Sequence, residues 1–176
     1  KLILTHDDLD HSGGLKELSK IVEIKEVITA KQDIEAPMRI HALIPGYKGE
    51  DENDDSVVSW FGRDGLTYLF MGDLGIKGEK AILDQYQDLP CDILKIAHHG
   101  SDTSSSADFL HAMKPRLALI SVGHDNRYGH PSETVLDTLR QEQIPYYSTA
   151  EDGAILIRST ALIKYVRTAR GEFAIM

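Results

Sequence analysis

Cysteine is almost absent from this sequence, and long apolar runs are missing altogether. Cys91 is the single cysteine, which excludes a disulfide framework and a metal site built from several thiolates. No apolar run reaches the roughly 18 residues that a membrane-spanning helix needs. We therefore expect one soluble domain over residues 1–176, with Cys91 as a small buried apolar side chain.

Positive charge is in deficit. The chain has 19 lysines and arginines against 28 aspartates and glutamates, which gives a net charge of −9. This balance excludes strong, sequence-independent binding of duplex nucleic acid through general electrostatics. Part of the negative charge is concentrated in residues 50–55, which hold five carboxylates. Bound divalent cations would offset some of it.

The chain opens directly on an apolar strand, with no secretory signal before it. This abrupt start predicts that the N-terminal portion of the domain is missing.

Strands and helices alternate through the middle of the sequence, with hairpins on either side. We predict helices from Leu15 onward and in residues 77–86, 104–113 (with a serine cap) and 132–141. Predicted strands cover residues 1–4, 21–28, 39–43, 56–61, 66–71, 92–97, 116–122, 146–148 and 154–157, with a strand pair in residues 160–176. The Asp64-Gly65 pair indicates a hairpin turn. The pattern predicts an α/β fold, a layered sandwich with helices outside the sheets.

Polar clusters recur where predicted strands end, and the first is the strongest. His6, Asp8, Asp10 and His11 follow the first strand within six residues. Imidazole and carboxylate groups are good ligands for zinc and manganese, and the spacing allows these side chains to converge in a tight loop. We expect all four to bind metal, although Asp10 could instead orient or deprotonate a nucleophile.

Two further clusters end later strands. Asp73 follows an apolar strand and is a candidate bridge between two metals. His98 and His99 are adjacent and must point in different directions. We expect His98 to bind metal and His99 to face substrate, where it would stabilise developing negative charge.

The fourth cluster is the loop from Asn126 to Pro131. His130 lies between glycine and proline, which restricts its backbone, and it is a candidate metal ligand. Arg127 is a candidate for binding a phosphate or carboxylate. Of the other histidines, we expect His41 and His111 to be structural, and His124 to face solvent.

Together these motifs resemble the metallo-β-lactamase superfamily. The first cluster is similar to the superfamily's His-x-His-x-Asp-His signature, with Asp8 in place of the second histidine. The full set resembles the C-terminal hydrolase domain of the ComEC family of competence proteins. The residues that carry this likeness are Thr5 to Gly14, Asn53 with Ser56, Gly72-Asp73, His98 to Ser101, and Asn126 to Pro131.

The resemblance implies an αββα sandwich and two divalent metal ions, zinc or manganese, that activate water for hydrolysis. Domains of this family begin with a strand pair before the first motif, which this chain lacks. The Asp8 substitution removes one imidazole and favours a harder ion such as manganese. The superfamily's usual third-motif histidine is also absent. Substrate-binding roles are expected for Asn53, Ser56, Ser101 and Asn126.

The implied activity is a phosphodiesterase or nuclease acting on single-stranded DNA during uptake in competence. Two alternatives stay open: a phosphodiesterase or esterase for a small molecule, and a non-catalytic, metal-stabilised module of a membrane DNA channel. The expected partners are DNA or a small phosphodiester, and a membrane channel portion of the same polypeptide. The expected location is the extracytoplasmic face of a bacterial membrane, or the cytoplasm if the domain stands alone.

Overall fold

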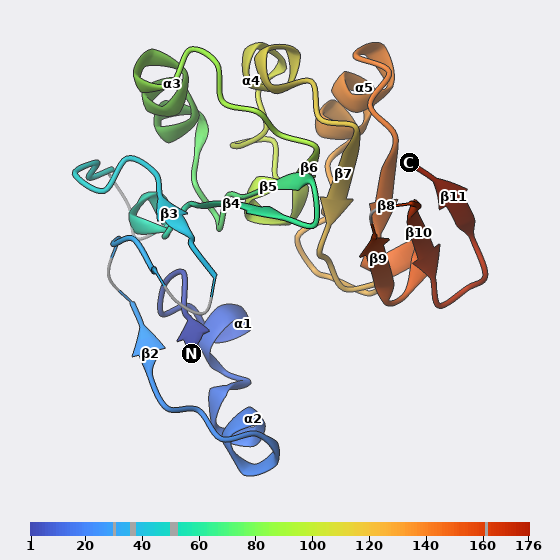
Figure 1. Ribbon diagram of the computed structural model, residues 1–176. Helices are drawn as coiled ribbons and strands as arrows, with labels where there is room; N and C mark the ends of the chain where they lie inside the picture. Colours follow the sequence, from blue (N-terminus) through green and yellow to red (C-terminus); the bar gives the residue numbers. More distant parts are fainter. Residues whose placement is uncertain (30, 36–37, 50–52, 161) are drawn as a thin grey trace.

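A six-stranded mixed sheet forms the centre of the molecule (Figure 1). The structure, a computed structural model, describes residues 1–29, 31–35, 38–49, 53–160 and 162–176. In spatial order the strands are β3 (His41–Ala42), β4 (Ser59–Arg63), β5 (Leu66–Phe70), β6 (Ile93–Lys95), β7 (Leu117–Ile120) and β8 (Tyr146–Ser148). The first three pair antiparallel, and β5 to β8 run parallel. The predicted α/β class is confirmed.

The β4–β5 hairpin has the predicted turn. Arg63 pairs with Leu66, which leaves Asp64 and Gly65 as a two-residue loop with φ of 51° and 72°. Two successive left-handed residues match the twist of the strands, and Asp-Gly adopts them at low cost.

Three helices cover one face of the sheet: α3 (Ile76–Gln85), α4 (Ala107–Met113) and α5 (Glu133–Gln141) (Figure 1). The hydroxyl of Ser132 accepts a hydrogen bond from the Val135 N–H and caps α5. The predicted start of α4 at residue 104 is wrong, because Ser106 is the capping residue. Ser104 donates instead to the carbonyls of Ala97 and Ser101.

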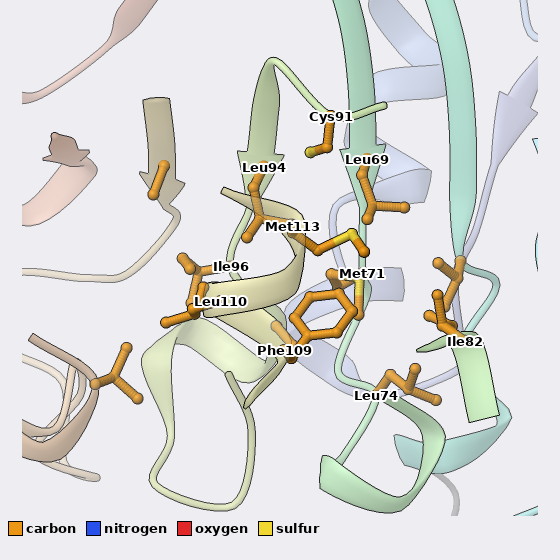
Figure 2. Close-up of a cluster of buried hydrophobic side chains, with 14 of the residues drawn as sticks. Leu69, Met71, Leu74, Ile82, Cys91, Leu94, Ile96, Phe109, Leu110 and Met113 are labelled. Carbon is orange, nitrogen blue, oxygen red and sulfur yellow. The ribbon is translucent and has the colours of Figure 1, made fainter. Parts of the chain in front are cut away.

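The main core lies between these helices and the sheet, and Figure 2 shows its centre. Phe109 and Leu110 of α4 pack against Met71 and Ile96, which extend from the ends of strands β5 and β6. Completely buried aliphatic and aromatic side chains each contribute about 1.5–3 kcal/mol. This packing fixes the strand ends from which the polar loops emerge.

Cys91 belongs to this core and is almost completely buried, as predicted (Figure 2). Burial raises the pKa of its thiol to about 12. Since only the thiolate reacts rapidly, we expect a thiol-specific reagent at pH 8 to leave the native protein unlabelled and to label it fully in denaturant. Fast labelling of the native protein would show that this part of the core opens.

A smaller sheet packs on the opposite face of the central sheet. It consists of β9 (Ile155–Ser159), β10 (Lys164–Thr168) and β11 (Phe173–Ile175), all antiparallel, with β10 in the middle. Val166 of β10 contacts a second apolar cluster formed by Leu66, Ile93 and Leu117 of the large sheet. The predicted C-terminal strand pair is confirmed. Strands β8 and β9 lie in different sheets because the short helix α6 (Thr149–Asp152) separates them.

The N-terminal segment lies beside the central sheet (Figure 1). Strand β1 (Leu2–Ile3) pairs parallel with β2 (Val27–Ile28), and the connection holds α1 (Leu9–Ser12) and α2 (Leu15–Ile21). Two predictions are wrong here. Helix α1 occupies part of the expected polar loop. Only the last two residues of the expected strand 21–28 pair with another strand, and α2 continues through Ile21.

Among the described residues, no helix combines the length and apolar character needed to cross a lipid bilayer. Of the acidic run in residues 50–55, residues 50–52 lie outside the described part, and Asn53–Asp55 form a short 3-10 helix.

Candidate metal centre

The first motif emerges from β1 and is fixed by hydrogen bonds to neighbouring chain segments. The Val57 N–H donates to the Thr5 carbonyl, which ties the motif to the segment before β4. Helix α1 then carries Asp10 and His11, with Asp8 at its N-terminal cap position. The short helix directs the His11 side chain back toward His6, and the centroids of the two imidazole rings lie 4.0 Å apart.

Asp73 lies at the centre of the site and is almost fully buried. It follows β5, and its backbone N–H donates to the Ser56 hydroxyl over 2.9 Å. Gly72 precedes it with φ +60°, and a Cβ there would lie 2.7 Å from the Ser56 Cβ. Glycine is therefore required at position 72 for the close approach that places the carboxylate.

Four histidines point their Nε2 atoms at one oxygen of Asp73. The distances to Asp73 Oδ2 are 3.2 Å from His11, 3.5 Å from His99, 3.9 Å from His6 and 4.0 Å from His98. Two aspartates lie at the rim, with Asp8 Oδ2 3.6 Å from His6 Nε2 and Asp10 Oδ2 3.2 Å from His99 Nε2. Loops from three separated parts of the sequence thus meet in one cluster, as predicted.

Two buried polar atoms in this cluster lack a hydrogen-bond partner among the described residues, which a bound metal would explain. His6 Nε2 and Asp73 Oδ1 are inaccessible to solvent and have no hydrogen-bond partner within the described part of the chain. Unpaired buried polar groups are rare and costly, so each requires an explanation. Two groups of ligand atoms lie close enough together to hold an ion: His6, His11 and Asp73, and Asp10, His11 and His99. Imidazole with carboxylate is a suitable donor set for zinc or manganese.

The two adjacent histidines, His98 and His99, differ in their contacts. Both have left-handed backbones, with φ of 46° at His98 and 54° at His99. His99 Nδ1 contacts the Ser121 carbonyl at 2.6 Å, which leaves Nε2 as the free ligand atom. A backbone carbonyl on the far ring nitrogen is the usual support of a metal-binding histidine. The structure thus places His99, rather than His98, in a metal-compatible group.

The protonation of these groups reflects their packing. Burial favours a raised pKa for Asp73, but hydrogen bonds from His11 and His99 outweigh it and lower the pKa far below its usual value. Burial lowers the pKa of His6, while the hydrogen bond to Asp73 raises the pKa of His99. Asp73 is therefore ionised at neutral pH, and because a metal binds the neutral imidazole, cations and protons compete for His99.

The geometry agrees with the comparisons to known proteins. Residues 1–68 match the family model described as the metallo-beta-lactamase superfamily. This part of the chain belongs to the metallo-β-lactamase superfamily. Its curated relatives include competence protein ComA of Neisseria gonorrhoeae, 34% identical over 88% of this chain, and ComE operon protein 3 of Bacillus subtilis, 29% identical over 89%. Recombination protein 2 of Haemophilus influenzae is 26% identical over 99% of the chain. The match spans 24% of the length of each of these three relatives.

Within this metallo-β-lactamase domain, the loop from Asn126 to Pro131 forms one wall of the site. Asn126 holds the loop: its side-chain oxygen accepts from the N–H groups of Tyr128 and His130, and its nitrogen donates to the carbonyls of Gly123 and His130. His130 lines the site, with its ring 5.8 Å from that of His98, but it lies outside both metal-compatible groups. Arg127 is exposed and does not line the hollow over the metal groups.

The other expected substrate-binding residues differ in position. Asn53 lines a hollow beside Asp73. Ser56 is buried beneath the centre, where its hydroxyl contacts His6 Nδ1 at 3.2 Å. Ser101 is also buried, and its hydroxyl contacts Thr103, whose own hydroxyl lies 3.5 Å from His98 Nδ1. Ser56 and Ser101 therefore position histidines.

The remaining histidines lie away from the centre. His41, His111 and His124 each contact a carboxylate of their own, on Asp33, Glu142 and Asp125 respectively. The side chain of His124 is 65% exposed, as expected for a solvent-facing residue.

Thr5 is a further residue of the site, and the sequence alone indicated no role for it. Its hydroxyl lies 3.1 Å from Nδ1 of both His6 and His11. It orients two candidate ligands at once, in the manner of the outer partners that tune metal sites. Nothing in the local sequence pattern separates such a threonine from an ordinary strand-end residue.

We expect Thr5→Val, which removes the hydroxyl but keeps the shape, to weaken metal binding about 10- to 100-fold, because outer partners have effects of this size. Competition with a fluorescent chelator would measure the affinity. Thr5→Ser keeps the hydroxyl and should bind within about threefold of the unaltered protein. Equal affinity in the valine variant would contradict the role of this residue.

Proposed function

We propose that this domain is a divalent-metal-dependent phosphodiesterase that cleaves single-stranded DNA during DNA uptake in competence. The observation that carries the proposal is the buried Asp73 carboxylate surrounded by four histidine Nε2 atoms, with two buried polar atoms left without a protein partner.

Two divalent ions, zinc or manganese, would share this cluster. His6, Asp8 and Asp73 would hold one, and Asp10, His11 and His99 would hold the other. His11 Nε2 lies 3.2 Å from Asp73 Oδ2 and belongs to both metal-compatible groups, so the two sets of ligands adjoin. When bound, such ions lower the pKa of water toward about 7 and polarise a phosphoryl oxygen.

The remaining residues would bind and orient the substrate. His98 and His130 line the same hollow, where their imidazoles would donate to phosphoryl oxygens of a bound substrate. The short contact from Asp10 to His99 supports a ligand role for Asp10 over that of a free base. Arg127 lies outside the hollow. It would therefore bind a phosphate of the DNA strand farther from the cleaved bond.

The substrate assignment comes from the relatives and from charge. The Neisseria relative is named a competence protein, the Bacillus relative is named for the ComE operon, and the Haemophilus relative is named a recombination protein. These names support a DNA substrate. The net charge of −9 disfavours tight binding of a long duplex by this domain alone. We propose that a membrane channel portion of a longer polypeptide delivers the strand, with this domain on the extracytoplasmic face.

The test is a cleavage panel on the unaltered protein with manganese, zinc or neither. Labelled single-stranded DNA should be degraded only when a metal is present, and more efficiently than the chromogenic substrate bis(p-nitrophenyl) phosphate. Cleavage of the chromogenic substrate alone would favour a small-molecule phosphodiesterase. Metal binding without cleavage of any substrate would favour a structural module of a channel.

A further inference from the structure

Two hollows meet at the metal centre. One has a volume of about 510 Å³ and is lined by the metal-side residues together with Leu9 and Tyr128. The other, about 550 Å³, is lined by Asn53, Lys77 and Thr103, among others. Asp73 and His98 belong to both linings, so the cleft continues on either side of the centre. A cleft of this kind suits an extended substrate that passes across the centre.

Two large apolar side chains that line the first hollow do not belong to the hydrophobic core. Tyr128 and Leu9 are both 83% exposed, although they come from separate parts of the chain. The Tyr128 hydroxyl has no hydrogen-bond partner among the residues that the structure describes. Large apolar side chains gathered at the mouth of a polar pocket point to a ligand with an apolar surface.

The Tyr128 ring is held in a defined plane. It stacks on the His130 ring with 5.9 Å between centroids and 16° between planes. Its backbone N–H donates to Asn126, whose side chain also anchors His130. The outer face of the tyrosine is therefore presented by a fixed loop, beside residues that line the metal centre.

We propose that Tyr128 is a stacking platform for a nucleobase next to the scissile phosphodiester. This inference rests on the proposed function and specifies its substrate as a strand with bases. Single-stranded nucleic acids bind by stacking bases on exposed aromatic rings, and every base offers the required planar face. A base on Tyr128 would leave the adjoining backbone over Asp73 and direct the next phosphate toward Lys77.

The experiment compares two substrates of equal length, an oligothymidylate and a polymer of abasic tetrahydrofuran phosphodiester units, with manganese present. The unaltered protein should cleave the oligothymidylate at least about tenfold more efficiently, because only that strand can stack. Tyr128→Ala should lose about tenfold or more in kcat/KM, mostly through KM, on the oligothymidylate alone. Tyr128→Phe keeps the ring and should retain the preference.

Each other result has a distinct meaning. If Tyr128→Ala lost kcat/KM equally on both substrates, the ring would only support His130. If it lost kcat/KM on neither, the ring would have no role in substrate binding. Both results overturn the inference. Equal cleavage of the two substrates by the unaltered protein also overturns it, while leaving the nuclease proposal intact. Failure to cleave either substrate would overturn the nuclease proposal itself.

Discussion

Asp73→Asn is expected to lower metal-dependent hydrolysis at least about 1,000-fold, because a metal contributes several kcal/mol to transition-state charge stabilisation and about 4 kcal/mol corresponds to this factor. The substitution keeps the size of the side chain and removes the charge that four histidines surround. Metal content, measured by inductively coupled plasma mass spectrometry, should fall from about two ions per chain. The melting temperature reports whether the fold survives.

Asp64→Asn is the matched control for this substitution. Asp64 occupies the left-handed position of the β4–β5 turn, at the opposite end of β5 from Asp73, and asparagine tolerates that conformation. It should retain full activity and full metal content. If Asp73→Asn kept its metals and its activity, the buried carboxylate would have no role at the centre.

His99→Gln and His98→Gln are expected to differ, although the two residues are adjacent. His99 contacts the Ser121 carbonyl through Nδ1 and belongs to a metal-compatible group. Its loss should remove about one ion per chain and at least about 100-fold of the activity, equivalent to about 2.7 kcal/mol. His98→Gln should keep both ions and lose about tenfold, the effect of one substrate hydrogen bond of about 1.4 kcal/mol.

His111→Gln provides the control for both variants, since the exposed His111 side chain contacts Glu142, away from the centre. Its activity and metal content should not change. The opposite ranking, with the ion lost in His98→Gln and kept in His99→Gln, would restore the assignment that the sequence alone favoured.

The sequence revealed which residues meet, because the meeting follows from topology. Asp73 and His99 follow the neighbouring parallel strands β5 and β6, whose carboxyl ends lie at the same edge of the sheet. His6 and His11 come from the segment after β1, which the Val57 N–H joins to the large sheet through the Thr5 carbonyl. The Asp64-Gly65 turn could also be predicted from the sequence, since only a few residue types adopt two left-handed conformations in succession.

The roles of individual side chains depended on features that have no signature in the sequence. His98 and His99 both have left-handed backbones, which set the directions of their side chains, and no residue pattern in the sequence encodes these conformations. Thr5 contacts two histidines, and Asn126 makes four hydrogen bonds within its own loop. Whether such contacts form depends on differences in atomic position of a few tenths of an ångström, which a sequence does not reveal.

Residues 21–28 illustrate a different limit. The β-branched residues Ile21, Val22, Val27 and Ile28 favour a strand, but helix α2 continues through Ile21 and only Val27–Ile28 pair with β1. The pairing available to a segment decides its conformation when propensity is weak.

Anomalous X-ray scattering from crystals soaked in manganese would test the central claim most directly. We expect two peaks beside Asp73, with ligand distances of about 2.0–2.3 Å to its carboxylate and to Nε2 atoms of His6, His11 and His99. Peaks confined to surface carboxylates, with His6 Nε2 and Asp73 Oδ1 still unpaired, would contradict a metal centre at this position.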